Sequence, residues 1–179
     1  MAFATGTTNY GLPQWGENEH VEISPDINEA FADIDTQMKA NQDNINLVAV
    51  EGDWTPTITF GTGSSGITYN QTYTVGHYIK IKNMVYVQGS VVLTNKGSSV
   101  GAVNISMPFS VRSGTYAPIT IGSFSGISYV GCISGFFTPG SDKALMQHIS
   151  EAGNIANIGE GNFANNAEFK FSGFYVAIN

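Results

Sequence analysis

An evenly spaced series of apolar residues near the N-terminus constrains this chain more than any other feature. The series alternates spacings of four and three, and Asn41 is its one polar member: Ile27, Phe31, Ile34, Met38, Asn41, Ile45 and Val48. This spacing is typical of a coiled-coil seam. The seam is too narrow to bury a helix in a globular core, whereas it suits association with other helices. We therefore expect an oligomer.

The start of the expected helix is well marked. Ser24 can cap it, Pro25 suits the first helical position, and acidic residues occupy the first turn. We expect the helix to run to about Val50 and to stop before Gly52. At a rise of ~1.5 Å per residue it would be about 40 Å long. A lone helix of that length is marginal in water unless it packs against a partner.

The residue types in the seam indicate how many helices the coiled coil contains. Ile27, Ile34, Asn41 and Val48 share one core position of the heptad. β-Branched residues there disfavour the two-stranded form and tolerate three or four strands. A polar Asn41 in the core costs stability but can set register and strand number. The alternative is a single amphipathic helix that lies on the rest of the protein. The lack of apolar residues flanking the seam argues against that alternative.

The chain after residue 53 has the periodicity of β structure. Residues 85–93 alternate with a period of two, interrupted by Gly89, and turn-forming stretches separate the other alternating segments. We expect a mainly β, antiparallel β-sandwich or jelly-roll-like head, preceded by the short coiled-coil helix. A long flexible loop is expected at 154–166. The expected strands are 53–60, 78–82, 85–93, 103–107, 117–122, 129–137, 145–149 and 169–178.

Composition and charge exclude several classes of protein. Apolar residues are 42% and charged residues 12% of the 179 residues, which favours a folded chain. No apolar run approaches the ~18 residues of a membrane span, and we expect no signal peptide. The net charge of −7 divides into −9 over residues 1–53 and +2 over residues 54–179. Without a dense basic patch we expect no nucleic-acid binding, and without a spanning apolar run we expect no membrane insertion.

Few residues are arranged for catalysis or metal binding. Cys132 is the only cysteine, which excludes an intrachain disulfide and a cysteine-based zinc site; we expect it to be buried. His77 and His148 have no acidic ligand pattern around them. Glu151 and Glu160 could meet but sit in polar segments where solvated acids are usual. We expect no enzyme, no cofactor and no metal.

Aromatic residues near expected turns are the remaining candidates for ligand contact. The planar faces of such rings can stack on the C–H-rich faces of sugars. For each residue, packing in the core is the competing interpretation. The candidates are Tyr116, Phe124, Tyr129 and Phe137.

The first 23 residues lack sustained periodicity but carry large apolar anchors. Tyr10, Leu12 and Trp15 lie within six positions of one another in an otherwise polar stretch. A mobile tail is one interpretation. The one that we favour is a peptide that becomes ordered on a partner.

Two stretches resemble bacteriophage tail proteins. TTNYGLPQW (7–15) followed by SPDINEAFADIDTQMKAN (24–41) is similar to the N-terminal segment of tail proteins from phages of Gram-positive bacteria. In that family a T-N-Y-x-L segment precedes a helix with a D-F-N-x-x-x-x-x-I-D pattern. Here Asp26, Asn28 and the Ile34-Asp35 pair match that pattern, and Ile27 replaces the usual Phe.

The second stretch covers most of the first half of the expected head. GDWTPTITFGTGSSGITY (52–69) and VGHYIKIKNMVYVQGSVVLTNKGSSVGAVNISMPF (75–109) resemble the β head of phage tail-fibre and receptor-binding proteins. A weaker similarity occurs at 171–175. Together the matches span roughly residues 8–109, and their motifs are structural. Residues 113–168 match nothing in that family.

The resemblance implies a homotrimeric virion fibre or receptor-binding protein of a phage tail or baseplate. Residues 1–23 would attach it to other virion proteins, 24–51 would form the trimeric stalk, and 52–179 would form the β head. The head would mediate adsorption to the host surface, but the motifs imply no particular receptor. We expect a glycan because the head is nearly neutral, has few possible catalytic acids and carries aromatic residues next to turn residues. Two alternatives remain: a structural or decoration fibre of capsid or tail without a specific receptor, and a small hydrolase of cell-wall glycan.

Overall fold

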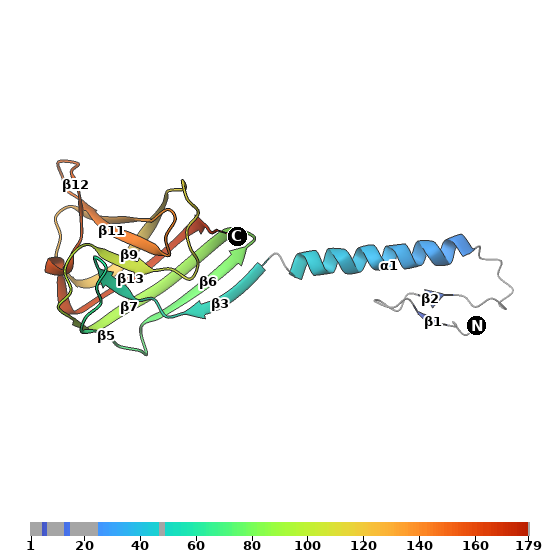
Figure 1. Cartoon of the computed structure of the whole chain (residues 1–179), viewed down its shortest axis with the longest axis horizontal. Coiled ribbons are helices and arrows are strands. Elements are labelled where there is room, and N and C mark those ends of the chain that lie inside the picture. The colour runs from blue at the N-terminus through green and yellow to red at the C-terminus, as the bar shows by residue number, and fades with distance from the viewer. Residues whose placement is uncertain (1–4, 7–12, 15–24, 47–48, 179) are drawn as a thin grey trace. The chain divides into compact units, whose positions relative to one another are not determined.

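The computed structural model describes residues 5–6, 13–14, 25–46 and 49–178 (Figure 1). Its contacts divide the chain into two units, Met1–Ala49 and Val50–Asn179. In the first unit, the short strands β1 (Thr5–Gly6) and β2 (Pro13–Gln14) pair antiparallel. The predicted attachment residues Tyr10, Leu12 and Trp15 lie outside the described residues.

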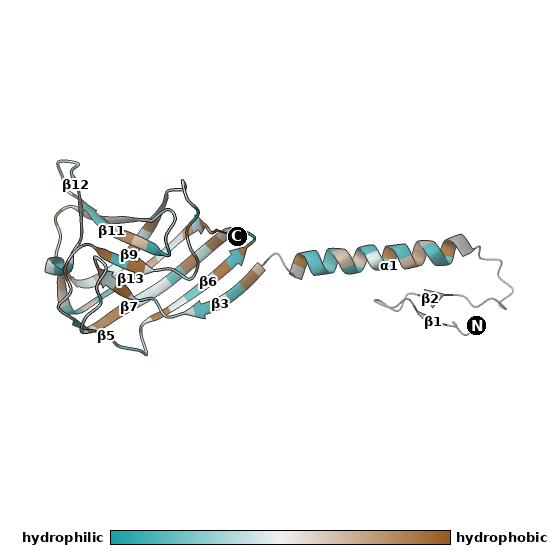
Figure 2. Ribbon diagram, viewed as in Figure 1, coloured by the Kyte–Doolittle hydropathy of each residue, from teal (hydrophilic) through white to brown (hydrophobic). Residues whose placement is uncertain are grey.

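Helix α1 (Pro25–Asn46) carries the predicted seam. It ends before the predicted Val50, because Ala49 and Val50 already belong to strand β3 (Ala49–Trp54). Four apolar seam side chains, Ile27, Ile34, Met38 and Ile45, are between 43% and 66% exposed in the single chain, and Asn41 is also exposed. Val48 lies outside the described residues. Figure 2 shows this helix as predominantly polar with apolar bands. The coiled coil itself stays a prediction.

The second unit is an antiparallel sheet, which confirms the mainly β class. The main path runs β3-β6-β7-β13-β9-β10-β11-β8-β4, while β5 pairs with β7 and β12 pairs with β11. The elements are β4 (Ile58–Phe60), β5 (Ile67–Tyr69), β6 (Val75–Ile81), β7 (Met84–Lys96), β8 (Val103–Ser106), β9 (Ala117–Ile127), β10 (Cys132–Phe137), β11 (Lys143–Ile149), β12 (Ile155–Asn157), the 3₁₀ turn η1 (Glu160–Asn162) and β13 (Phe163–Val176).

One continuous sheet, curled into a half-barrel, takes the place of the predicted sandwich or jelly roll. Strand β9 pairs along most of its length with β13, and its first two residues pair with β10, so the hydrogen-bonded path is unbroken. Because the sheet curls, strands near opposite ends of that path come into contact. The Trp54 indole N–H, on β3, donates at 3.4 Å to the carbonyl of Ser106, the last residue of β8.

Two local predictions are wrong. The segment 154–166 is not one flexible loop, because β12, η1 and the start of β13 form within it. Its Asn-rich and Gly-rich composition resembles a loop, but Ile158 and Phe163 are buried and cross-strand pairing overrides local preference. Cys132, which was predicted to be buried, is exposed at the first position of β10.

The concave face of the sheet holds the core. Val85, Val87, Val91 and Leu93 of β7 are buried as the alternation predicted. Tyr175 is buried among them, and this burial raises the pKa of its hydroxyl. The protonated hydroxyl donates to the Phe109 carbonyl at 3.0 Å, so its polar end is satisfied.

A row of two glycines between two aromatic residues crosses four neighbouring strands. Gly76 pairs with Gly89, and Gly89 pairs with Phe171. A Cβ added to Gly76 would lie 2.7 Å from the Trp54 ring, and one added to Gly89 would lie 2.6 Å from the Phe171 ring. The two rings meet edge to face over the glycines, with centroids 6.3 Å apart. Both glycines are therefore required for this packing.

We expect Gly89→Ala to destabilise the protein by about 1–3 kcal/mol, because the buried Phe171 ring has no free space into which to move. Gly122→Ala is the matched control: it also lies in a strand, and its Cβ would meet nothing within 4 Å. Alanine there is expected to be neutral or stabilising by up to about 1 kcal/mol. Urea unfolding of both variants measures the difference. Equal free energies of unfolding would contradict the packing argument.

Candidate binding groove

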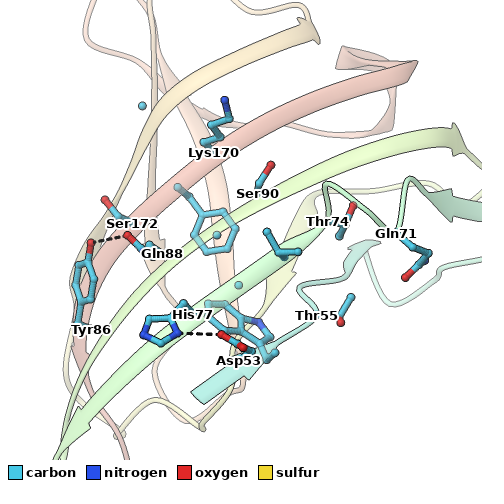
Figure 3. A pocket seen from close by; sticks show the side chains of 16 residues that line it. Asp53, Thr55, Gln71, Thr74, His77, Tyr86, Gln88, Ser90, Lys170 and Ser172 are labelled. Atoms are coloured by element: carbon cyan, nitrogen blue, oxygen red, sulfur yellow. Dashed lines mark hydrogen bonds and ion pairs between the residues drawn. The ribbon is translucent and has the colours of Figure 1, made fainter. Parts of the chain in front are cut away.

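The convex outer face of the sheet carries a groove of about 760 Å³ across β3, β6, β7 and β13 (Figure 3). This face is opposite the core because side chains alternate along each strand, so Tyr86 and Gln88 point outward between buried valines. Cross-strand pairing places His77 beside Gln88 and Gln88 beside Ser172. A second row places Val75 beside Ser90 and Ser90 beside Lys170. The groove therefore follows two rows of outward-facing side chains, which are polar except for Val75.

Two hydrogen bonds orient the polar groups of the first row. His77 Nδ1 lies 2.9 Å from Asp53 Oδ1. A carboxylate only accepts, so the proton is on Nδ1, and Nε2 is left for a ligand. The Tyr86 hydroxyl donates to Gln88 Oε1 at 3.4 Å, which leaves the Gln88 amide N–H groups to donate elsewhere (Figure 3). The row thus combines donors and acceptors held in defined directions.

The bottom of the groove is the backbone of the row that lies between its two outward-facing rows. Gly76, Gly89 and Phe171 belong to this middle row, and its side-chain positions point to the core, where Phe171 is buried. The outward-facing apolar side chain of the lining is Val75, which is 55% exposed and pairs with Ser90. An apolar contact among polar groups is the usual composition of a small-molecule site, and it suits the apolar face of a ring whose edge carries hydroxyl groups.

The charges in the groove nearly cancel. The described lining residues include one carboxylate, Asp53, and one lysine, Lys170. The other polar members are neutral: Thr55, Gln71, Thr74, His77, Tyr86, Gln88, Ser90 and Ser172. Asp53 is already paired with His77. The arrangement favours recognition by neutral hydrogen bonds over recognition by Coulomb attraction.

The four aromatic residues predicted from the sequence lie outside this groove and do not form one cluster. Tyr116 is 77% exposed and contacts Phe136, with ring centroids 6.1 Å apart. Phe124 and Tyr129 meet edge to face at 5.2 Å and are half-buried. Phe137 is fully buried against Tyr175 at 4.6 Å, so it is a core residue that offers no surface to a ligand.

The candidates predicted from the sequence do not include the groove residues. Those candidates were aromatic residues near expected turns, whereas the groove is lined by side chains on strand faces. One signal was available in the sequence: the outward positions of the segment 85–93 carry Tyr86, Gln88 and Ser90 beside the irregular Gly89. Polar residues that alternate with core valines mark the solvent-facing side of a strand, where another molecule can reach it.

The described part of the chain holds no group of three or more His, Cys, Asp or Glu residues placed to bind a metal ion. Helix α1 is too polar to cross a bilayer, and the described residues include no other helix of sufficient length.

Comparison with known proteins identifies the class of fold. No protein-family model and no curated protein matches the sequence. Among solved structures, the chain shares its fold with part of a phage tailspike. That structure is the crystal structure of the Dettilon tailspike protein: the TM-score is 0.60 at 18% identity, over 72% of this chain and 24% of that one. The match thus spans about a quarter of the tailspike.

Proposed function

We propose that this chain is a phage virion fibre or receptor-binding protein that mediates adsorption to the host surface as a homotrimer. The fold shared with part of a phage tailspike is the observation that carries the proposal. The motifs in residues 8–109 that resemble phage tail proteins support it independently. In this scheme residues 1–23 attach the protein to a tail or baseplate, 24–51 form the stalk, and 52–179 form the head.

The groove on the outer face is our candidate for the receptor site, and a host glycan is the ligand that fits it best. Sugars are recognised by hydrogen bonds to their hydroxyls and by stacking of their apolar faces. The first row supplies amide, imidazole and hydroxyl groups, and Val75 supplies an exposed apolar side chain. Tyr116 and the Phe124–Tyr129 pair are two separate competing candidates, in the region where the sequence does not resemble the family.

We propose binding without cleavage. Glycoside hydrolysis generally needs two carboxyl groups that flank one bond. The described groove lining includes one carboxylate, Asp53, which is committed to His77. The alternative of a small cell-wall hydrolase predicts release of reducing sugar from host walls. The alternative of a decoration fibre predicts no saccharide binding at all.

The trimer is tested by mass. At micromolar concentration, multi-angle light scattering should give about three times the 19.1 kDa of the chain, because the exposed seam of α1 is buried only when helices associate. A monomeric mass at every concentration would contradict the homotrimer and the multivalent adsorption that depends on it.

The role of Asn41 is tested by Asn41→Ile in the full chain. We expect a higher melting temperature, because an apolar residue replaces a polar one in a dry seam. Asn44→Ile is the matched control, since Asn44 lies on the same helix outside the seam series and is also exposed. A rise for Asn44→Ile alone, or for both variants equally, would place Asn41 outside the seam.

The receptor site is tested on a printed array of bacterial surface polysaccharides. His77→Ala and Gln88→Ala should each weaken binding roughly tenfold, because each removes a hydrogen bond oriented toward the ligand. His148→Ala, on β11 of the other half of the sheet, is the control and should bind like the parent. Because the groove is nearly neutral, binding should change little with salt.

Parallel variants separate the possible outcomes. If Tyr116→Ala or Tyr129→Ala loses binding while the groove variants do not, the site lies in the aromatic loops. If the trimeric parent binds no polysaccharide, the decoration-fibre alternative takes first place.

A further inference from the structure

A patch of exposed apolar side chains lies on the outer face, directly beside the groove. Cross-strand pairing forms its two rows: one is Ile79, Tyr86 and Phe174, and the other is Ile81, Met84 and Val176. We call these six residues the outer apolar patch. Ile81, Met84 and Phe174 are 43%, 53% and 59% exposed, and no member is charged. Tyr86 and Phe174 are in ring contact, with centroids 4.8 Å apart.

Such a patch is costly to leave in water. Burial of apolar surface contributes about 25 cal/mol per Å², and contiguous exposed apolar patches mark interaction sites. Aromatic residues and methionine are also the types that are enriched in protein interfaces. By contrast, the polar groups that would read sugar hydroxyls lie in the neighbouring rows, at His77 and Gln88.

The place of the patch in the sheet indicates what covers it. Strand β3 pairs with β6, with Gly52 against the Tyr78 ring and Asp53 bonded to His77. The strands are antiparallel, so the start of β3 lies at the same end of the sheet as Ile81. Helix α1 ends at Asn46, and β3 begins at Ala49. The patch therefore lies at the end of the sheet where the chain arrives from the helix.

We propose that the outer apolar patch packs against a second copy of this chain in the assembly that the helix seam forms. This inference rests on the homotrimer of the proposed function, and it names the surface through which the heads meet. Parallel helices joined by their seams would deliver every copy of β3 at the same level. Identical patches would then be held at high effective concentration, whereas any other partner must be recruited from solution.

The interface has a consequence for the groove. Tyr86 belongs to the patch and also lines the groove, where its hydroxyl is bonded to Gln88. A neighbouring copy packed on Tyr86 would stand at the edge of the groove and would form one of its walls. Each receptor site would then be complete only in the assembled protein.

Charged substitutions in the full chain test the interface. Met84→Asp and Phe174→Asp should each raise the concentration at which the assembly dissociates by roughly tenfold or more, as measured by sedimentation. Ile155→Asp is the matched control, because Ile155 is 62% exposed and apolar but lies on β12. We expect the control to dissociate like the parent. Equal dissociation of all three variants and the parent would overturn the proposal and leave the helix-mediated trimer intact.

A second measurement does not depend on the stability of those variants. A nitroxide label is placed at Met84→Cys or at Ile155→Cys in a Cys132→Ser background, because Cys132 is exposed and would also react. The two sites are similarly exposed in the single chain. The label at residue 84 should be strongly immobilised in the assembly and the label at 155 mobile.

Three results would overturn the proposal in distinguishable ways. Equal mobility of the two labels would show that the patch stays uncovered. Loss of polysaccharide binding by Met84→Asp with an unchanged dissociation concentration would assign the patch to the receptor. A parent protein that is monomeric throughout would reject the patch interface together with the proposed homotrimer.

Discussion

The contact of Trp54 with Phe171 over the glycine pair is the interaction on which the sheet depends. Both rings need the space that side chains at Gly76 and Gly89 would occupy. The rings of Trp54 on β3 and Phe171 on β13 cover the two glycines on the strands between them. Apolar atoms therefore fill the space that the missing glycine side chains leave. Trp54 also donates its indole N–H to Ser106 on β8. One side chain therefore fills the glycine row and ties the first strand of the sheet to the returning end.

The opposite face of this row is the bottom of the candidate groove. Side chains alternate between the two faces of a sheet, so a residue that points to the core presents only its backbone to the outside. The groove is located over this row, between His77 and Gln88 on one side and Ser90 and Lys170 on the other. Core packing and the candidate site therefore share the same strands. A substitution at Gly89 that displaced β7 would move both, and stability must be measured before any loss of binding is interpreted.

Local patterns predicted the elements better than their arrangement. The helix start at Pro25 and the buried alternation of β7 follow from capping and from a period of two, which are properties of neighbouring residues. The continuous curl depends on pairings between distant segments, such as Ala117 with Phe137, and no local signal encodes those. Asn and Gly residues at 154–166 favoured a loop, and only partner strands reveal that Phe163 begins β13.

The candidate site shows the same limit. Phe137 carried the right chemistry for stacking, but its position in the sheet turned it inward, because side-chain direction depends on register and not on residue type. His77 and Gln88 attracted no attention in the sequence, since they are eleven residues apart and become neighbours only through the β6–β7 pairing. The sequence could therefore indicate that polar and aromatic residues alternate with core residues, but not which of them share a surface.

Under the proposed function, the outer face brings together two physical requirements of adsorption. A shallow, nearly neutral groove binds a saccharide weakly, because each hydrogen bond to the ligand replaces one to water and contributes only about 1 kcal/mol. Useful adhesion then needs several sites held together, so that the first binding event raises the effective concentration for the second. Placing the apolar patch in the rows next to the groove links these requirements through Tyr86, which belongs to both. A patch that joins copies would hold the grooves in a fixed mutual geometry, and that geometry selects surfaces on which the saccharide repeats at a matching spacing.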